Sequence, residues 1–328
     1  MRHMLALCVL ALAASAAAAQ AADKVRLTIP VLSEVDYAPF YLGTDKGYFA
    51  AEGLDVELVG AGGSVATPAL ISGDVQFSGS PSAAISAILK GAPLRIIYVA
   101  RDRPPYQLWA SDPAIKTLED LKGKQVGVVS RGDTHENAIH LLLMAHNIDP
   151  GAVAFTALGF GTGRVAALNA GSLPAASLTI EDIEQLKRTP NQHMVADTWH
   201  EVQMLVGGIV VNERMLKADR PLGLRFLRAL IKGERYMHAN EAGTITAMLT
   251  HNPNVARDNV TKVYRELVPG NTADGTLPPK VQQAMLDLYA DILGMPHDKE
   301  RPIAEAFDFS LLAEVDRSLA ASGWKPGP

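Results

Sequence analysis

Several junctions along the chain combine glycine with a hydroxyl or carboxylate residue, in the pattern that begins a helix directly after a β-strand. They include Ser64 after two glycines, Ser80 before a proline, Asp133 three residues before a glutamate, and Thr179 three residues before Asp182. Such side chains cap a helix, and a helix N-terminus offers N–H groups and a positive dipole end to an anion. In an open α/β sheet these junctions meet at the carboxyl ends of the strands, where ligands bind. The pattern therefore predicts a ligand-binding cleft and favours a small, anionic ligand.

The candidate ligand-binding residues lie at these junctions or beside them. Arg131 and His135 flank the capping position Asp133, and Tyr37 lies in a loop before a helix. Arg101 follows a predicted strand, where a solvated run of charges is the alternative interpretation. The predicted contacts are Tyr37, Ser64, Ser80, Arg101, Arg131, Thr134, His135, Thr162 and Thr179.

The junction at 130–135 is the predicted site of an anionic head group. The other end of the ligand is expected near Tyr37, Ser64 and Ser80. Arg131 would supply a charge-assisted donor there. Asp133 argues the other way, because a carboxylate at the N-cap already occupies the helix N–H groups and repels an anion. If Asp133 faces the cleft, the head group is instead neutral or cationic.

Motifs for catalysis or for a cofactor are incomplete. Residues 161–166 fit G-x-G-x-x-A, but they lie in mid-chain without a preceding βαβ half. His135, Glu136 and His140 exceed the H-E-x-x-H spacing by one residue, which turns the second imidazole by about 100° around a helix. Ser64 narrowly misses a nucleophile elbow, and no partner histidine is identified by spacing. The sequence therefore predicts no enzyme activity, no cofactor and no metal site.

The composition sets the broad class. The chain has 328 residues, of which 48% are hydrophobic and 20% charged, so it is long enough for about two domains around an ample core. With 30 basic and 35 acidic residues the net charge is -5, which leaves no broad basic surface for nucleic acid. The single cysteine, Cys8, cannot form an internal disulfide. We expect a monomeric globular protein with no nucleic-acid partner.

The N-terminus has the order of a secretory signal peptide. A basic residue at position 2 precedes an apolar run at 4–14, and a tract of small residues ends at Ala21. Cleavage after Ala21 would leave a mature chain without cysteine. A membrane anchor is the alternative, but a span needs about 20 mostly apolar residues, and alanines and Gln20 dilute this segment. We expect an exported, periplasmic protein.

Short β-branched runs alternate with helical patterns over the first two thirds of the chain. Strands are predicted at 25–32, 54–59, 75–78, 95–100, 125–129, 152–158, 175–178 and 209–211. Helices are predicted at 38–51, 65–71, 81–89, 135–147, 164–170, 222–240, 254–267, 280–293 and 303–319. This alternation predicts the α/β class, with doubly wound parallel sheets and a helical C-terminal tail.

Residues 39–56 resemble the A-x-x-K-G-[FY]-F-x-x-x-G-L-D-V opening of periplasmic substrate-binding proteins of the nitrate/sulfonate/taurine type, the type II periplasmic binding proteins. The segments at 70–77, 91–93, 118–128 and 167–171 follow in the order of that family. The resemblance implies two α/β lobes joined by two crossings that close like a hinge on the ligand. From Leu173-Pro174 to Thr179 the sequence departs from the family pattern, so no particular ligand is carried over.

The resemblance also implies a division of the chain. It predicts a signal peptide at 1–21, a first lobe at 22–111 and 208–328 that includes the helical tail, and a second lobe at 112–207. The crossings are expected near 109–111 and 206–209. The implied function is that of the solute-binding component of an ABC importer, which captures a small, anionic organic or sulfonate-like ligand and delivers it to membrane permease subunits. The alternatives are an enzyme of the same fold, of pyrimidine-precursor or menaquinone-pathway type, and an exported ligand sensor for a membrane kinase.

Overall fold

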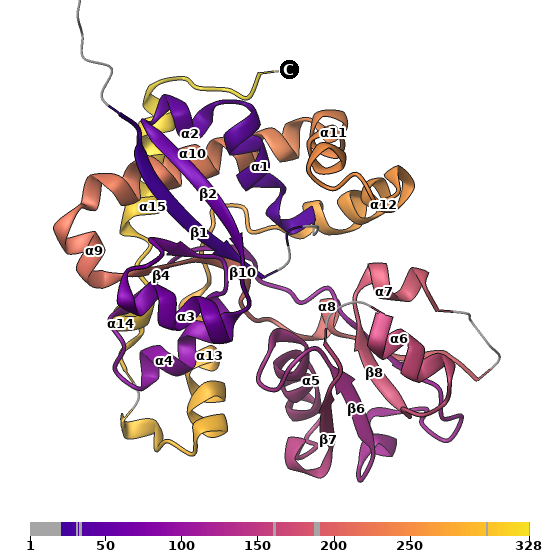
Figure 1. The fold of residues 1–328 in the computed structure, drawn as a ribbon. Coiled ribbons are helices and arrows are strands. Elements are labelled where there is room, and N and C mark those ends of the chain that lie inside the picture. Colours follow the sequence, from indigo (N-terminus) through magenta and orange to yellow (C-terminus); the bar gives the residue numbers. More distant parts are fainter. Residues whose placement is uncertain are drawn as a thin grey trace, which may run out of the picture.

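The computed structural model describes residues 21–30, 32, 35–159, 162–186, 191–299 and 301–327, and positions 1–20 of the predicted signal peptide lie outside them. The strands of the described residues form two five-stranded sheets (Figure 1). The first sheet has the order β2-β1-β3-β10-β4, and its strands are β1 Asp23–Ile29, β2 Leu54–Gly60, β3 Phe77–Ser78, β4 Leu94–Arg101 and β10 Val206–Asn212. The second has the order β7-β6-β8-β5-β9, and its strands are β5 Gln107–Ala110, β6 Gln125–Val128, β7 Ala154–Ala157, β8 Ala175–Leu178 and β9 His193–Asp197.

The predicted α/β class is confirmed, but the sheets are mixed rather than wholly parallel. Strand β1 runs parallel to β2 and β3, and β6 runs parallel to β7 and β8. Strand β10 is antiparallel to β3 and β4, and β5 is antiparallel to β8 and β9. Each of these two strands enters its sheet directly from the other sheet, so no crossover helix imposes a parallel direction.

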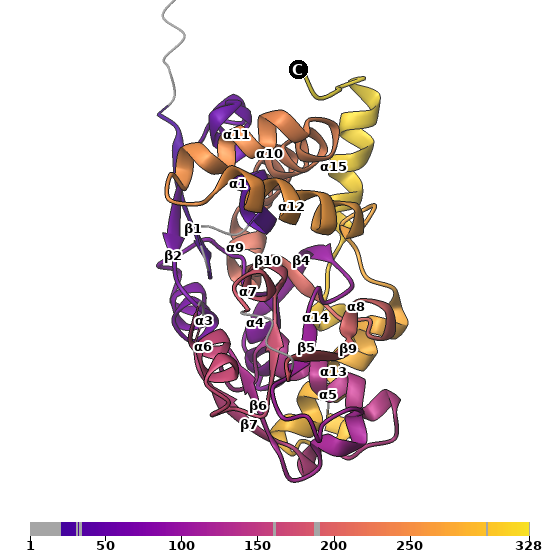
Figure 2. The ribbon, with the colours of Figure 1, turned by 90° about the vertical axis from the view of Figure 1, so that its right-hand side faces the viewer.

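Helices surround both sheets. Their bounds are α1 Ala38–Asp45, α2 Tyr48–Ala51, α3 Gly63–Ser72, α4 Pro81–Leu89, α5 Thr134–Ala145, α6 Thr162–Asn169, α7 Ile180–Glu184, α8 Thr198–Glu201, α9 Glu213–Ala218, α10 Arg220–Ala239, α11 Glu241–His251, α12 Arg257–Leu267, α13 Pro279–Leu293, α14 Ile303–Ala306 and α15 Ser310–Ala321. We call the first sheet with its helices the first lobe, and the second sheet with α5 to α7 the second lobe. In Figures 1 and 2 the orange and yellow tail stays with the first lobe, as predicted. No helix in the described ranges has the length and apolar character needed to cross a membrane.

The core of the first lobe explains why the tail packs there. Helix α10 presents Phe226 to the sheet, and its ring stacks on Phe77 of β3 with the centroids 3.7 Å apart. Both rings are fully buried, and burial of a phenylalanine contributes about 1.5–3 kcal/mol. Behind it, Gly233 lets α10 approach α1, because a Cβ at this position would lie 2.3 Å from the Pro39 carbonyl oxygen.

The two crossings lie a few residues earlier than the sequence predicts. Trp109 belongs to β5 of the second sheet, so the first crossing is 102–106 rather than 109–111. Strand β10 begins at Val206, so the second crossing is 198–205. Two prolines within the first crossing, at 104 and 105, lack N–H groups and cannot donate to a β-ladder. Strand β5, which follows them, has four residues, too few to show periodicity, and was not predicted.

Candidate functional site, a cleft between the two lobes

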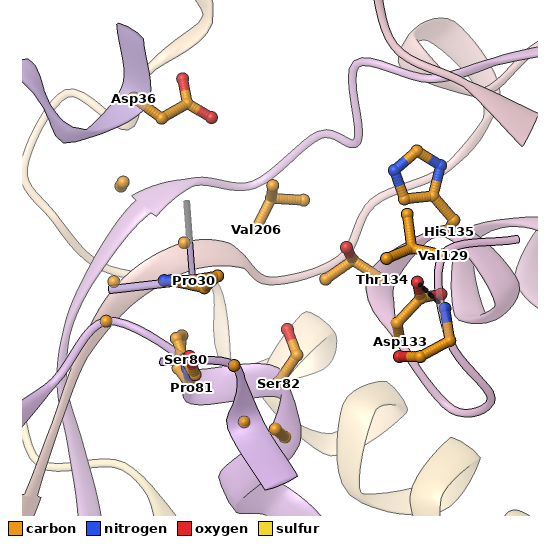
Figure 3. Close-up of a pocket in the computed structure, with 18 of the residues that line it drawn as sticks. Pro30, Asp36, Ser80, Pro81, Ser82, Val129, Asp133, Thr134, His135 and Val206 are labelled. Atoms are coloured by element: carbon orange, nitrogen blue, oxygen red, sulfur yellow. Dashed lines mark hydrogen bonds between the residues drawn. The ribbon is translucent and has the colours of Figure 1, made fainter. Parts of the chain in front are cut away.

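A cavity of about 1050 Å³ lies between the lobes and is lined by residues of both. Small-molecule sites occupy about 300–1,000 Å³, so the space suits an organic ligand better than a small inorganic ion. Figure 3 shows Ser80 and Ser82 of the first lobe on one side and Thr134 and His135 of the second lobe on the other. Asp36 lies above them in the same view.

The structure brings together most of the residues that the sequence singled out. Seven of the nine line the cavity, namely Tyr37, Ser64, Ser80, Arg131, Thr134, His135 and Thr179. Arg101 and Thr162 are described residues that are not among those lining it. Arg101 is only 2% exposed, because it lies behind the residues that line the cavity. At the junction before Thr162, the described residue that lines the cavity is Gly159.

Arg101 organises the wall of the first lobe from behind. Its Nη1 and Nη2 atoms donate to the two carboxylate oxygens of Asp36, at 3.0 and 2.8 Å. Nη2 also donates to Oδ1 of Asn271 at 2.9 Å, and the Asn271 amide donates to Glu234 at 2.7 Å. Burial raises the pKa of the Tyr98 hydroxyl well above its usual range, and the neighbouring Glu234 carboxylate raises it further. This network fixes two carboxylates, Asp36 and Glu234, at the cavity surface.

The predicted anion cradle at the start of α5 is already occupied by the chain itself. Asp133 accepts hydrogen bonds from the backbone N–H groups of Ser130, at 2.8 Å, and Glu136, at 2.9 Å. Arg131 turns its Nε to both carboxylate oxygens of Glu136, at 3.1 and 2.9 Å. The counter-argument from Asp133 is therefore the one that the geometry supports, since its carboxylate already accepts from the Glu136 N–H at the start of α5 and would repel an anion.

His135 is a neutral group in this cleft. Its ring stacks on Tyr106 of the first crossing, with the centroids 3.8 Å apart, and its Nδ1 lies 2.9 Å from the Ser177 hydroxyl. Burial lowers the pKa of His135 well below its usual value, and the positive charge of Arg164 lowers it further. The imidazole therefore presents an aromatic, uncharged surface rather than a cation.

The start of α7 adds a carboxylate from the second lobe. Thr179 and Asp182 form the predicted capping box, in which the Thr179 hydroxyl accepts from the Asp182 N–H and Asp182 accepts from the Thr179 N–H. Asp182 also pairs with the buried Arg164. Glu181 is thereby left at the cavity surface, where burial raises the pKa of its carboxyl.

Aromatic side chains line the cavity from the first lobe and from the first crossing. Tyr37 stacks on Phe40 with the centroids 6.2 Å apart, and both line the first-lobe side. The hydroxyl of Tyr106 lies 2.8 Å from the Thr134 hydroxyl, which ties the first crossing to α5. Tyr289 of α13 also lines the cavity. These rings suit a ligand with an apolar or planar body.

Sequence reasoning missed several residues of the cleft. Asp36 stands directly before the predicted contact Tyr37, so its place in the same loop was a usable signal. Glu181 lies between Thr179 and Asp182 in the capping motif, and the motif predicts the two capping residues but not the position of Glu181. Glu234 lies in the middle of helix α10, and no local pattern indicates that it reaches a cleft.

Two α/β lobes, two connecting segments and one cleft lined from both sides define the fold of the type II periplasmic binding proteins. The chain belongs to the NMT1/THI5-like family, whose model matches residues 34–243, more than half of its length. The predicted resemblance to nitrate- and sulfonate-type periplasmic binding proteins is thus confirmed.

Solved structures with this fold include binding proteins of known ligand. The alkanesulfonate-binding protein SsuA from Xanthomonas axonopodis pv. citri, bound to MOPS, is 18% identical, with a TM-score of 0.65 over 90% of this chain and 97% of that one. The nitrate-binding protein NrtA from Synechocystis PCC 6803 is 12% identical, with a TM-score of 0.66 over 91% of this chain and 89% of that one. A structure from Bordetella bronchiseptica RB50 is 21% identical, with a TM-score of 0.77 over 92% of this chain and 99% of that one.

One relative of known name has a different ligand in its name. The riboflavin-binding protein RibY of Chloroflexus aurantiacus is 25% identical over 224 residues, which are 64% of this chain. The chain spans 61% of the length of that relative. The names of these similar proteins include chemically different ligands, namely an alkanesulfonate, nitrate and riboflavin. The ligand of this cleft therefore has to be inferred from the residues that line it.

Proposed function

We propose that the protein is the solute-binding component of an ABC importer, exported to the periplasm, which captures a small organic ligand and delivers it to membrane permease subunits without chemical change. The observation that carries the proposal is the 1050 Å³ cavity lined from both lobes. The names of its structural neighbours, which include a ligand-binding component of an ABC-type import system from Staphylococcus aureus, support the same role.

The connections between the lobes suit a hinge. The first lobe would comprise residues 22–101 and 206–328, and the second lobe residues 107–197, with the crossings 102–106 and 198–205 between them. At the end of the second crossing, Gly207 and Gly208 have φ angles of +65° and +143° and line the cavity. These angles favour glycine, and a Cβ at Gly208 would lie 2.2 Å from the Tyr98 carbonyl oxygen. Both glycines belong to β10, where Gly208 is paired with Val99 of β4, so this close approach of the two strands fixes the point at which the second crossing joins the first sheet.

Polar side-chain contacts also join the lobes outside the crossings. The Asn137 amide of α5 donates to the hydroxyl of Tyr289 in α13 at 2.7 Å, and both residues are buried. Lys262 of α12 pairs with Glu184 of α7. Closure and opening would rearrange such contacts, together with the packing of Ile180 of α7 against the first-lobe helices.

Solution scattering combined with a ligand screen tests the proposal. Thermal-shift screening identifies a ligand, because a ligand at 100 times its dissociation constant adds about 2.7 kcal/mol of stability. At saturation the radius of gyration should decrease, and mass spectrometry should recover the ligand unchanged. An unchanged radius contradicts a closing clamp, and a converted ligand would favour an enzyme of the same fold.

A further inference from the structure

The cleft carries an excess of negative charge. Among the described residues that line it, the carboxylates are Asp36, Asp133, Glu136, Glu181 and Glu234, and the basic side chains are Lys90 and Arg131. Arg131 is paired with Glu136, and Lys90 is exposed at the rim. Behind the wall, Arg101 is paired with Asp36. Among the described residues, neither an arginine nor a lysine forms an ion pair with Asp133, Glu181 or Glu234, although His238 lies 3.3 Å from Glu234. The carboxylates that line the cavity thus outnumber the cations beside it, and the cavity is net negative.

Two of these carboxylates belong to opposite lobes. Asp36 lies in the short 3-10 helix η1 (Val35–Tyr37) of the first lobe, and Glu181 lies at the start of α7 in the second. Burial raises the pKa of Glu181, and the negative charge of Asp36 contributes to the same shift. The pair with Arg101 offsets part of the Asp36 charge, and the charge that remains repels Glu181 more strongly as the lobes approach, because water between them is displaced.

An independent feature also indicates that a polar ligand completes this cavity. Ser80 lines it, is only 8% exposed, and its hydroxyl has no hydrogen-bond partner among the described residues. Buried hydroxyl groups are normally hydrogen-bonded, since an unsatisfied one is unfavourable. Tyr37 and Phe40 provide an aromatic wall on the same lobe.

We propose that the ligand is a small organic cation, an amine, amidine or guanidine, whose N–H donors lie between Asp36 and Glu181 and whose body contacts Tyr37. The charge of the ligand neutralises the repulsion between the two walls, so that the lobes close on it and not without it. Nitrate or a sulfonate would add a further negative charge to the same space. This inference rests on the proposed function, because it assigns the ligand class of the same cleft.

Calorimetric titration of the exported protein with ligands of one shape and different charge tests the inference. The probes are benzamidine, which is cationic, benzamide, which is neutral, and benzoate and benzenesulfonate, which are anionic. Benzamidine should bind about 10- to 100-fold more tightly than benzamide, the range for hydrogen bonds to a charged group, and the anions should not bind measurably. Failure of benzamidine to bind, or tighter binding of either anion, would overturn the inference.

Substitutions of carboxylates in the second lobe test whether Glu181 causes the preference for benzamidine. Glu181→Gln should remove most of the preference for benzamidine over benzamide and give a smaller radius of gyration without ligand, since one facing charge is gone. Glu119→Gln is the matched control, because its exposed carboxylate pairs with Lys122 within the second lobe and does not line the cavity. Equal effects of the two variants would refute the role of Glu181. Benzoate binding with closure would refute the cation and keep the proposed function, whereas binding without closure would refute the clamp.

Discussion

Replacement of Arg101 by methionine is the most direct test of how the first-lobe wall is built. The guanidinium is 2% exposed and makes hydrogen bonds of 2.8–3.0 Å to Asp36 and Asn271. Removing one partner of a buried ion pair costs about 3–5 kcal/mol, because the other charge is left without compensation. The Asp36 side chain is 25% exposed and regains some hydration, so the lower end of the range, about 3 kcal/mol, is expected for Arg101→Met.

Urea unfolding followed by far-ultraviolet circular dichroism measures this loss. Asp36→Asn should also destabilise the protein, and the double variant should lose less than the sum of the two single losses, with a coupling energy of about 1–3 kcal/mol. Arg220→Met is the matched control. Its pair with Glu314 has side chains 48% and 43% exposed, so about 0–1 kcal/mol is expected.

A loss below about 1 kcal/mol for Arg101→Met, or strict additivity in the double variant, would refute this account. In that case Asp36 is held in place by packing rather than by Arg101. If the slope of the free energy of unfolding against urea concentration changes, the substitution has altered the unfolded or the native state. The urea midpoints of the single variants are then compared with the midpoint of Arg220→Met.

Three further predictions follow from packing, titration and processing. Gly233→Ala should lower the free energy of unfolding by about 1–3 kcal/mol, because its Cβ would lie 2.3 Å from the Pro39 carbonyl oxygen. Urea unfolding measures this loss, and no loss would mean that α10 and α1 move apart without cost. Burial lowers the pKa of His135, so below about pH 6.5 the unfolded chain binds a proton that the folded chain does not, and stability falls as the pH falls. His135→Gln should show a smaller loss between about pH 7 and 5, and an equal loss would contradict a buried neutral imidazole. The exported protein should begin at Ala22 and contain no thiol, so N-terminal sequencing or a thiol titration that finds one cysteine per chain would contradict the predicted cleavage.

Local patterns predicted much of the fold. Each of the eight predicted strand segments contains a strand, and Pro81–Leu89 is a helix with the predicted bounds. The predicted helix at 38–51 is two helices, because Gly47 takes a φ of +69° between them. Periodicity and capping act over a few residues, so they are visible in the sequence whenever an element is long enough to display them.

The capping residues of the second lobe were predicted correctly, whereas the pairing of the charged side chains around the cleft could not be read from the sequence. Asp133 and Thr179 cap α5 and α7 as expected from their spacing. The sequence favoured an anionic ligand because several helix N-termini offer N–H groups and a positive dipole end, and because Arg131 stands beside one of these caps. In the structure Arg131 is paired with Glu136, so that arginine does not make the site cationic.

What the sequence determined on its own was therefore the α/β class, most of the element boundaries, the family and the junctions that line the cleft. Tertiary structure alone decided the electrostatic character of the site. Glu234 reaches the cavity from a helix about 200 residues after Asp36, and Asn271 and Arg101 connect the two carboxylates behind the wall. Local propensity depends on neighbours within a few residues, whereas the field in a cleft is the sum over charges that only the folded chain brings together.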